Sequence, residues 1–141
     1  MNVEASEARA RFSSSTVARM ATVGVGGVPH LVPVTFAMLG ENTLVSAVDH
    51  KPKRTAALRR LANIAANPAV CLLVDEYSED WAALWWARAD GHARIVVPGQ
   101  ERELRDVAID TLAARYVQYA QRRPSGDLIV VEVERWSGWR A

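Results

Sequence analysis

The sequence has little of what disulfide-rich or membrane-spanning proteins need. Its 141 residues include a single cysteine, Cys71, which excludes an internal disulfide and lies in an apolar run, as in reduced cytosolic proteins. No apolar run approaches the roughly 20 residues of a membrane span. The charged stretch at residues 1–11 also differs from a secretory signal. We therefore expect a cytoplasmic protein without a membrane partner.

The usual patterns of metal centres, nucleotide-binding loops and hydrolase nucleophiles are missing as well. The histidines His30, His50 and His92 are not spaced as metal ligands, and no cysteine pair or carboxylate accompanies them. The glycine-rich run at residues 24–27 joins two expected strands instead of opening a helix, which argues against a Rossmann or P-loop site. The Ser/Thr run at residues 13–16 lacks glycine flanks and is typical of a cap or turn. We therefore expect no metal.

What the chain does have is the composition of one globular domain. Half of its residues are hydrophobic, and 17 basic residues nearly balance 16 acidic ones. A chain of this length can bury roughly 68–70% of its unfolded surface, so neither a metal nor disulfides are needed to hold a core. Such a composition excludes a disordered or collagen-like chain. We expect a single domain over residues 1–141.

One segment concentrates positive charge. Between Asp49 and Asp75 there are five basic residues and no acidic one. The segment begins where an expected strand ends and precedes an expected helix, whose unpaired N–H groups also attract anions. A solvated basic loop is the simpler interpretation. Nucleic acid is disfavoured, because the chain is nearly neutral overall and has neither a recognition helix nor an aromatic RNA-binding motif. The five basic residues are Lys51, Lys53, Arg54, Arg59 and Arg60.

The hydrophobic pattern predicts a mostly antiparallel β protein with a few helices. Short connections between the first strands leave no room for the crossover helix that parallel pairing needs. In the N-terminal helix, Phe12 and Val17 are expected to face inward. The chain then forms a small β-barrel with helices at its ends. Helices are expected at residues 4–19, 55–66 and 100–121, and strands at 20–25, 28–39, 43–48, 69–74, 81–97 (interrupted near 90–91) and 127–136.

The aromatic segment at residues 77–86 holds three of the five tryptophans. Neighbouring residues on a strand point to opposite faces, so at most one of Trp85 and Trp86 can fill the interior. The other is expected to pack under a helix, against a second subunit or beside a planar ligand. The acidic residues at positions 75, 76, 79 and 80 form a solvated turn or pair with the basic segment of a second subunit.

Several motifs resemble those of a known family. Ala21-Thr22-Val23 and the run from Gly27 to Phe36 resemble the opening hairpin of the flavin and deazaflavin oxidoreductases of the split β-barrel class, related to pyridoxamine-phosphate oxidase. The stretch at residues 49–53, Asn67-Pro68 and the aromatic segment resemble one branch, the probable F-420-dependent proteins, F-420 being 8-hydroxy-5-deazaflavin. The resemblance covers about residues 7–98. It implies a six-stranded antiparallel split β-barrel, the pyridoxamine-phosphate-oxidase-like FMN-binding fold, with flanking helices.

The resemblance also implies a cofactor site at the interface of a homodimer. In this family the cofactor ring lies across the second and third strands, where backbone groups hydrogen-bond its edge. The matching residues here are Val32, Pro33, Val34 and Thr35. Basic residues after the third strand hold the phosphate and the acidic tail of the cofactor. They match Lys51, Lys53, Arg54 and Arg60, with Asn63 nearby.

The function that these features imply is hydride transfer between F-420 and a small organic substrate. F-420 carries a phosphodiester and several glutamate carboxylates, whereas FMN carries one phosphate, so five basic residues favour F-420. Two alternatives are an FMN-binding oxidase or reductase of the pyridoxamine-phosphate-oxidase type and a non-catalytic protein that binds or carries F-420. No catalytic residue is assigned: Tyr77, His30 and His50 have the chemistry of a proton donor, and so has water.

Overall fold

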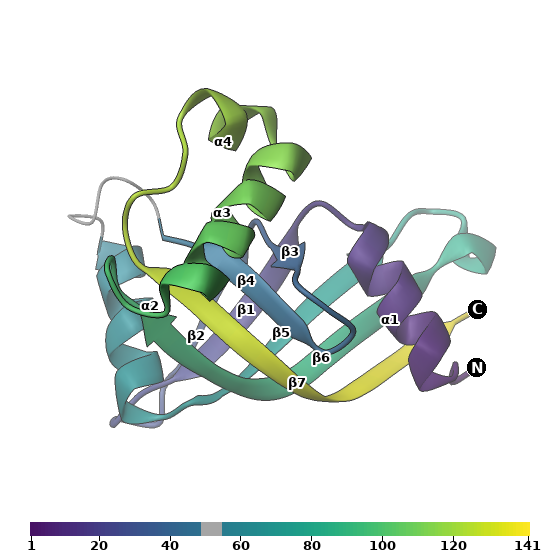
Figure 1. The fold of residues 1–141 in the computed structure, drawn as a ribbon. Coiled ribbons are helices and arrows are strands. Elements are labelled where there is room, and N and C mark those ends of the chain that lie inside the picture. The colour runs from purple at the N-terminus through teal and green to yellow at the C-terminus, as the bar shows by residue number, and fades with distance from the viewer. Residues whose placement is uncertain (49–54) are drawn as a thin grey trace.

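The computed structural model describes residues 1–48 and 55–141. This part of the chain is mostly β, as predicted, and Figure 1 shows one strongly curled sheet with helices packed around it. No helix in the described ranges is both long and apolar enough to cross a membrane. The elements are α1 (Ala5–Ser14), β1 (Ala18–Val23), β2 (Pro29–Val34), β3 (Ala37–Met38), β4 (Thr43–Ala47), α2 (Thr55–Ala66), β5 (Ala69–Glu76), the 3-10 helix η1 (Trp81–Ala83), β6 (Trp85–Val96), α3 (Arg102–Arg115), α4 (Val117–Gln121) and β7 (Leu128–Arg140).

The described strands form one antiparallel sheet in the order β2-β1-β5-β6-β7-β4-β3. The two strands at the ends of this order, β2 and β3, are separated in the chain only by Thr35 and Phe36. The expected count of six strands is therefore corrected to seven. The run at residues 28–39 forms two strands because its backbone at Thr35 and Phe36 bonds to side chains instead of a neighbouring strand.

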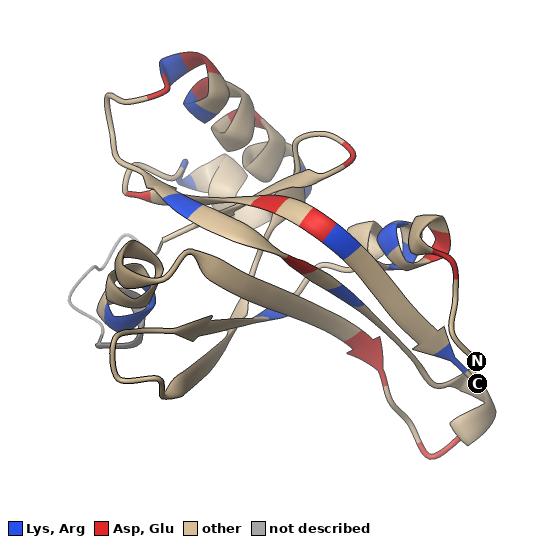
Figure 2. Cartoon of the chain, turned by 90° about the horizontal axis from the view of Figure 1, so that it is seen from below, with Lys and Arg blue, Asp and Glu red and all other residues tan. Residues whose placement is uncertain are grey.

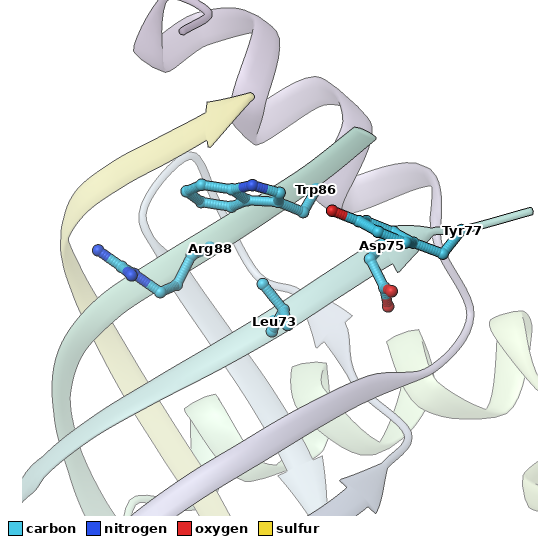
Figure 3. A pocket seen from close by; sticks show the side chains of 5 residues that line it. All are labelled: Leu73, Asp75, Tyr77, Trp86 and Arg88. Carbon is cyan, nitrogen blue, oxygen red and sulfur yellow. The ribbon is translucent and has the colours of Figure 1, made fainter. Parts of the chain in front are cut away.

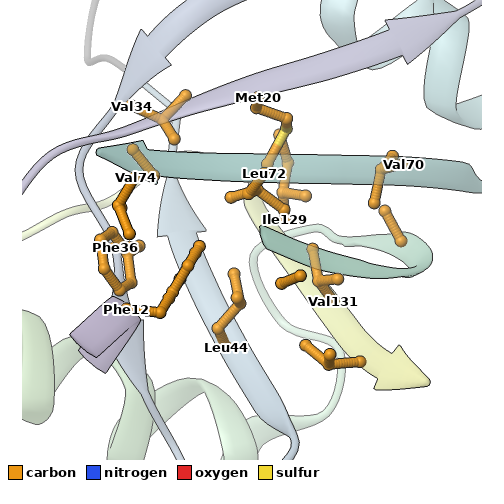
Figure 4. Close-up of a cluster of buried hydrophobic side chains, with 14 of the residues drawn as sticks. Phe12, Met20, Val34, Phe36, Leu44, Val70, Leu72, Val74, Ile129 and Val131 are labelled. Atoms are coloured by element: carbon orange, nitrogen blue, oxygen red, sulfur yellow. The ribbon is translucent and has the colours of Figure 1, made fainter. Parts of the chain in front are cut away.

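The inward-facing side chains of the sheet form the main hydrophobic core (Figure 4). Met20 of β1 and Leu72 of β5 are fully buried, as alternation along a half-buried strand requires. Phe12 of α1 and Phe36 complete this core, with their ring centroids 4.9 Å apart. A second cluster lies under α3 and includes Val45, Ala108, Leu112, Leu128 and Val130. Helix α1 thus covers part of the sheet's inner surface, whereas α3 packs on the opposite face of β4 and β7, where Val45 and Val130 point.

Two expected helices differ from the observed ones. The N-terminal helix ends at Ser14, so Phe12 is buried as predicted, whereas the prediction for Val17 is wrong because it lies beyond the helix and is 43% exposed. The expected helix at 100–121 is broken at Tyr116, whose extended backbone (φ −122°, ψ 124°) separates α3 from α4. The break allows the Tyr116 hydroxyl to bond to the backbone of Phe36. The helix predicted at residues 55–66 is confirmed.

The interruption predicted near residues 90–91 is confirmed as a register shift between β6 and β7. The shift lies between Asp90 and Gly91 of β6. A Cβ atom at Gly91 would lie 2.1 Å from the carbonyl oxygen of Glu132, so the two backbones approach too closely for any other residue. A bulge of this kind increases the local twist, which helps a long strand pair to follow a curled sheet.

Candidate functional site

The segment expected to carry a cofactor ring consists of β2 and the residue after it. Val32 and Val34 point toward the core, whereas Pro33 is exposed on the other face, and Thr35 is half-buried. In the described chain β2 pairs only with β1, so its other edge presents backbone groups that no strand uses. An edge of this kind can hydrogen-bond a planar heterocycle through the main chain.

Two tyrosines hold the interruption that follows β2. The Tyr116 hydroxyl accepts a hydrogen bond from the Phe36 N–H at 3.1 Å and lies 2.8 Å from the Phe36 carbonyl oxygen. The Tyr119 hydroxyl oxygen is 2.8 Å from Thr35 Oγ1. On the other side, Ser46 Oγ donates to the Thr35 carbonyl oxygen at 2.7 Å. The backbone at residues 35 and 36 is therefore fixed by the Tyr116 and Ser46 side chains, and Tyr119 fixes the Thr35 side chain.

The sequence analysis did not identify these tyrosines as part of the site. Their spacing of three residues in an expected helix places both on one face, which was the available signal. The spacing does not show which residues the two hydroxyl groups bond to, because residues 35–36 and 116–119 come together only in the folded chain.

Replacing Tyr116 by phenylalanine is expected to lower the free energy of unfolding by about 1–3 kcal/mol, because the Phe36 N–H loses its acceptor. Urea denaturation followed by circular dichroism measures the change. Tyr77→Phe is the matched control, since the Tyr77 hydroxyl forms no hydrogen bond within the described chain, and it should change stability by less than about 0.5 kcal/mol. Equal losses in both variants would show that the Tyr116 hydroxyl does not hold the interruption.

The basic residues expected to hold an anion lie on α2 as far as the structure describes them. This helix carries arginines and no acidic residue (Figure 2). Arg60 is only 8% exposed, and its Nε has no hydrogen-bond partner among the described residues. Burial lowers the pKa of its guanidinium, and the nearby Tyr119 partly offsets this effect. Lys51, Lys53 and Arg54 lie outside the described residues.

Asn63 attaches α2 to the sheet. Its Nδ2 donates to Thr22 Oγ1 at 3.0 Å. A Cβ atom at Gly24 would lie 2.2 Å from Asn63 Oδ1, so the glycine lets α2 approach the turn between β1 and β2. Asn63 therefore sets the position of Arg60, which lies one helical turn earlier on α2.

His30 of β2 is a third basic group near the arginines of α2. Its Nδ1 is buried and has no hydrogen-bond partner in residues 1–48 and 55–141. Burial lowers the pKa of His30, and the positive charges of Arg59 and Arg60 lower it further. We refer to His30, Arg59 and Arg60 as the basic cluster. A bound anion would offset the repulsion within this cluster and would supply the acceptor that its buried nitrogens lack, so the residues present fit a cofactor with an anionic tail.

Trp85 and Trp86 point to opposite faces, as predicted. Trp85 packs against the main core, and its Nε1 donates to Glu76 at 3.1 Å. Trp86 lies on the outer face of the sheet. Of the acidic residues at positions 75, 76, 79 and 80, Asp75 forms an ion pair within the chain, with Arg19 at 3.4 Å. Trp86 is therefore the tryptophan of this pair that is available to a ligand or a second subunit.

A family model described as pyridoxamine 5'-phosphate oxidase matches residues 5–140 of the chain. No curated protein sequence matches it.

Several solved structures share the fold. A FAD-binding protein from Mesorhizobium loti is 20% identical with a TM-score of 0.73, over 98% of this chain and 95% of that chain. A FAD-binding protein from Mycobacterium smegmatis is 17% identical with a TM-score of 0.65, over 99% of this chain and 97% of that chain. A heme-binding protein from the same organism is 23% identical with a TM-score of 0.68, over 96% of this chain and 53% of that chain. At such identities the likeness concerns the fold alone.

Proposed function

Because the chain belongs to the pyridoxamine 5'-phosphate oxidase family, we propose that it is an oxidoreductase with F-420 as its cofactor. The observation that carries this proposal is the basic cluster, in which His30 Nδ1 and Arg60 Nε are buried without a hydrogen-bond partner in the part of the chain that the structure describes. F-420 has a phosphodiester and several glutamate carboxylates. An anionic tail of this kind supplies both the negative charge and the acceptors that the cluster lacks.

The chain's own residues bind and orient the cofactor. The free edge of β2 holds the ring through backbone groups, and Tyr116 and Tyr119 keep the backbone that follows in place. The basic cluster binds the tail. When bound, the cofactor supplies a hydride to an unsaturated organic substrate, and the protein contributes position and the exclusion of water. No side chain is assigned to the accompanying proton, which solvent can deliver.

The proposal includes a homodimer with the cofactor at its interface. Exposed apolar side chains on β2 and on the turn before it, Val25, Val28 and Leu31, support this arrangement because Leu31 lies on the same strand as the proposed ring position, next to Val32. Contiguous apolar side chains on a protein surface commonly mark an interaction site.

A second candidate is a flavin enzyme with the same fold. It is favoured by the two FAD-binding proteins among the structural neighbours. FMN or FAD would occupy the same edge of β2 and place its phosphate against the basic cluster.

Titration of the purified protein with F-420 and, separately, with FMN distinguishes these functions, with cofactor fluorescence as the readout. We expect tight F-420 binding that weakens as salt is added, because ionic contacts are screened, and weak FMN binding. The reverse order of affinities would identify a flavin enzyme. F-420 binding of equal strength in the oxidised and reduced forms, with no substrate reduced, would indicate a carrier. Binding of neither cofactor would refute the proposal.

His30 gives F-420 binding a predicted pH dependence. Its pKa is lowered in the free protein, and a bound anion raises it, so binding takes up a proton. The affinity should therefore increase as pH falls from the raised pKa of the complex to the lowered pKa of the free protein. His30→Gln should remove this dependence, as titrations between pH 5 and 8 would show. His92→Gln, which changes a histidine that contacts Glu134 instead, should keep it. A pH dependence that persists in His30→Gln would exclude His30 from the anion site.

A further inference from the structure

The outer face of the sheet carries a pocket that the proposed cofactor site does not use. It has a volume of about 340 Å³ and is lined by Leu73, Asp75, Tyr77, Trp86 and Arg88. Leu73 pairs with Arg88, and Asp75 pairs with Trp86, across the antiparallel strands β5 and β6. Residues paired in this way share a face of the sheet. Two neighbouring cross-strand pairs and the residue after β5 therefore build the pocket.

Flat and apolar surfaces make up much of this pocket. Figure 3 shows Arg88 and Tyr77 at its opposite ends, with Trp86 and Leu73 between them. The Tyr77 side chain is 65% exposed, so its ring faces solvent over the opening. The Arg88 guanidinium carbon lies 5.7 Å from the centre of the Trp86 ring. Aromatic faces of this kind stack on planar molecules.

The polar groups of the pocket are mostly donors without acceptors. Trp86 Nε1, the Tyr77 hydroxyl and the terminal nitrogens of Arg88 have no hydrogen-bond partner in the part of the chain that the structure describes. Arg88 uses only its Nε, which donates to Asp90 at 2.9 Å. The acceptor in the pocket, Asp75, is already paired with Arg19. A ligand that satisfies these groups must carry acceptors, and a negative charge suits the free end of Arg88.

We propose that this pocket binds a planar aromatic molecule that carries a carboxylate. The ring would stack on Trp86 and Tyr77, and the carboxylate would accept hydrogen bonds from Arg88. A volume of about 340 Å³ fits a molecule of one or two rings. This proposal of a binding site depends on the pocket and not on the proposed function.

The pocket lies on the same sheet as the proposed ring position but does not touch it. Pro33, Arg19, Leu73 and Arg88 are successive partners across β2, β1, β5 and β6. At ~4.8 Å between strands, the pocket begins roughly 10 Å from the proposed ring position and on the face to which Pro33 points. A molecule bound at this distance is out of reach for hydride transfer from the ring, so the pocket is a site separate from the proposed reaction.

The test is a calorimetric titration of the full chain without added cofactor, with 2-naphthoate as the probe. We expect one molecule bound per chain, and binding up to about fivefold tighter than that of the neutral 2-naphthamide, since an exposed ionic contact contributes up to ~1 kcal/mol. Arg88→Gln should remove the preference for the carboxylate. Trp86→Leu should weaken binding about two- to tenfold, as loss of an aromatic contact does.

Two variants outside the pocket are the matched controls. Arg135→Gln removes another arginine near Asp90, and Trp81→Leu removes a tryptophan that is 77% exposed. Both should bind 2-naphthoate like the unchanged chain. Unchanged binding in Arg88→Gln and Trp86→Leu, or equal affinity for the naphthamide, would overturn the proposal. So would an affinity that falls as protein concentration rises, because a second copy would then cover the pocket.

Failure of this proposal can be told apart from failure of the proposed function. F-420 titrations of Arg88→Gln should give the same affinity as the unchanged chain, because Arg88 is not part of the basic cluster. Lost naphthoate binding with intact F-420 binding supports the pocket as a separate site. Absent F-420 binding with intact naphthoate binding would refute the proposed function and leave the pocket standing.

Discussion

Replacing Phe12 by alanine is expected to lower the free energy of unfolding by about 3–5 kcal/mol. The Phe12 ring is fully buried, with its centroid 4.9 Å from that of Phe36 and 5.2 Å from that of Trp136. Apart from Phe12, Ala8 is the buried residue of α1. The substitution therefore leaves a cavity between three aromatic positions and removes most of the contact that attaches α1 to the sheet.

Urea denaturation of the full chain measures this loss. Phe12→Leu keeps most of the volume and should cost less than about 1.5 kcal/mol. Val17→Ala, which changes an exposed residue just beyond the same helix, should stay within about 0.5 kcal/mol. A loss below 1 kcal/mol for Phe12→Ala would show that α1 contributes little to the folded state.

Phe36 connects this core to the candidate site. Its ring packs against Phe12, and its backbone bonds to the Tyr116 hydroxyl. The interruption between β2 and β3 is thus held from the inner side by the Phe12 ring and from the break between α3 and α4 by the Tyr116 hydroxyl. A change in α1 is transmitted to the edge of β2 through this one residue, so Phe12→Ala should also weaken cofactor binding.

Sequence patterns predicted the elements whose cause is local. The helix at residues 55–66 has apolar residues at helical spacing and ends before Asn67-Pro68, and it is confirmed over its whole length. The split of the run at 28–39 could not be predicted in this way. Its residues favour one continuous strand, and the interruption depends on Tyr116, which is 80 residues away.

The candidate site likewise has features that the sequence predicted and features that depend on the folded chain. The charge of Arg60 was evident from the sequence, whereas its burial was not, because burial depends on how Asn63 fixes α2 against Thr22. For His30 the sequence suggested only a proton donor. The loss of solvent around its Nδ1 and the nearby arginines follow from the pairing of β2 with β1 and the packing of α2.

Replacing Arg60 by methionine is expected to weaken F-420 binding about 30- to 150-fold, or that of FMN if the titration identifies FMN. A charge-assisted contact to a nearly buried guanidinium is worth roughly 2–3 kcal/mol, because the anion keeps its desolvation cost when the partner is removed. The free energy of unfolding should stay the same or rise. Arg60 Nε is buried without a partner in the described ranges, and exchanging a buried charge for an apolar side chain of similar length is often neutral or stabilising.

Arg59→Met is the matched control, since Arg59 is exposed on the same helix. A solvent-exposed charge contributes up to about 1 kcal/mol, so this variant should lose no more than about fivefold in affinity. Fluorescence titration and urea denaturation of both variants separate the two roles of an arginine. Unchanged affinity together with lower stability in Arg60→Met would make Arg60 a structural residue of α2. Lower affinity at full stability is the result expected of a residue that is kept buried and unpaired for an anionic ligand.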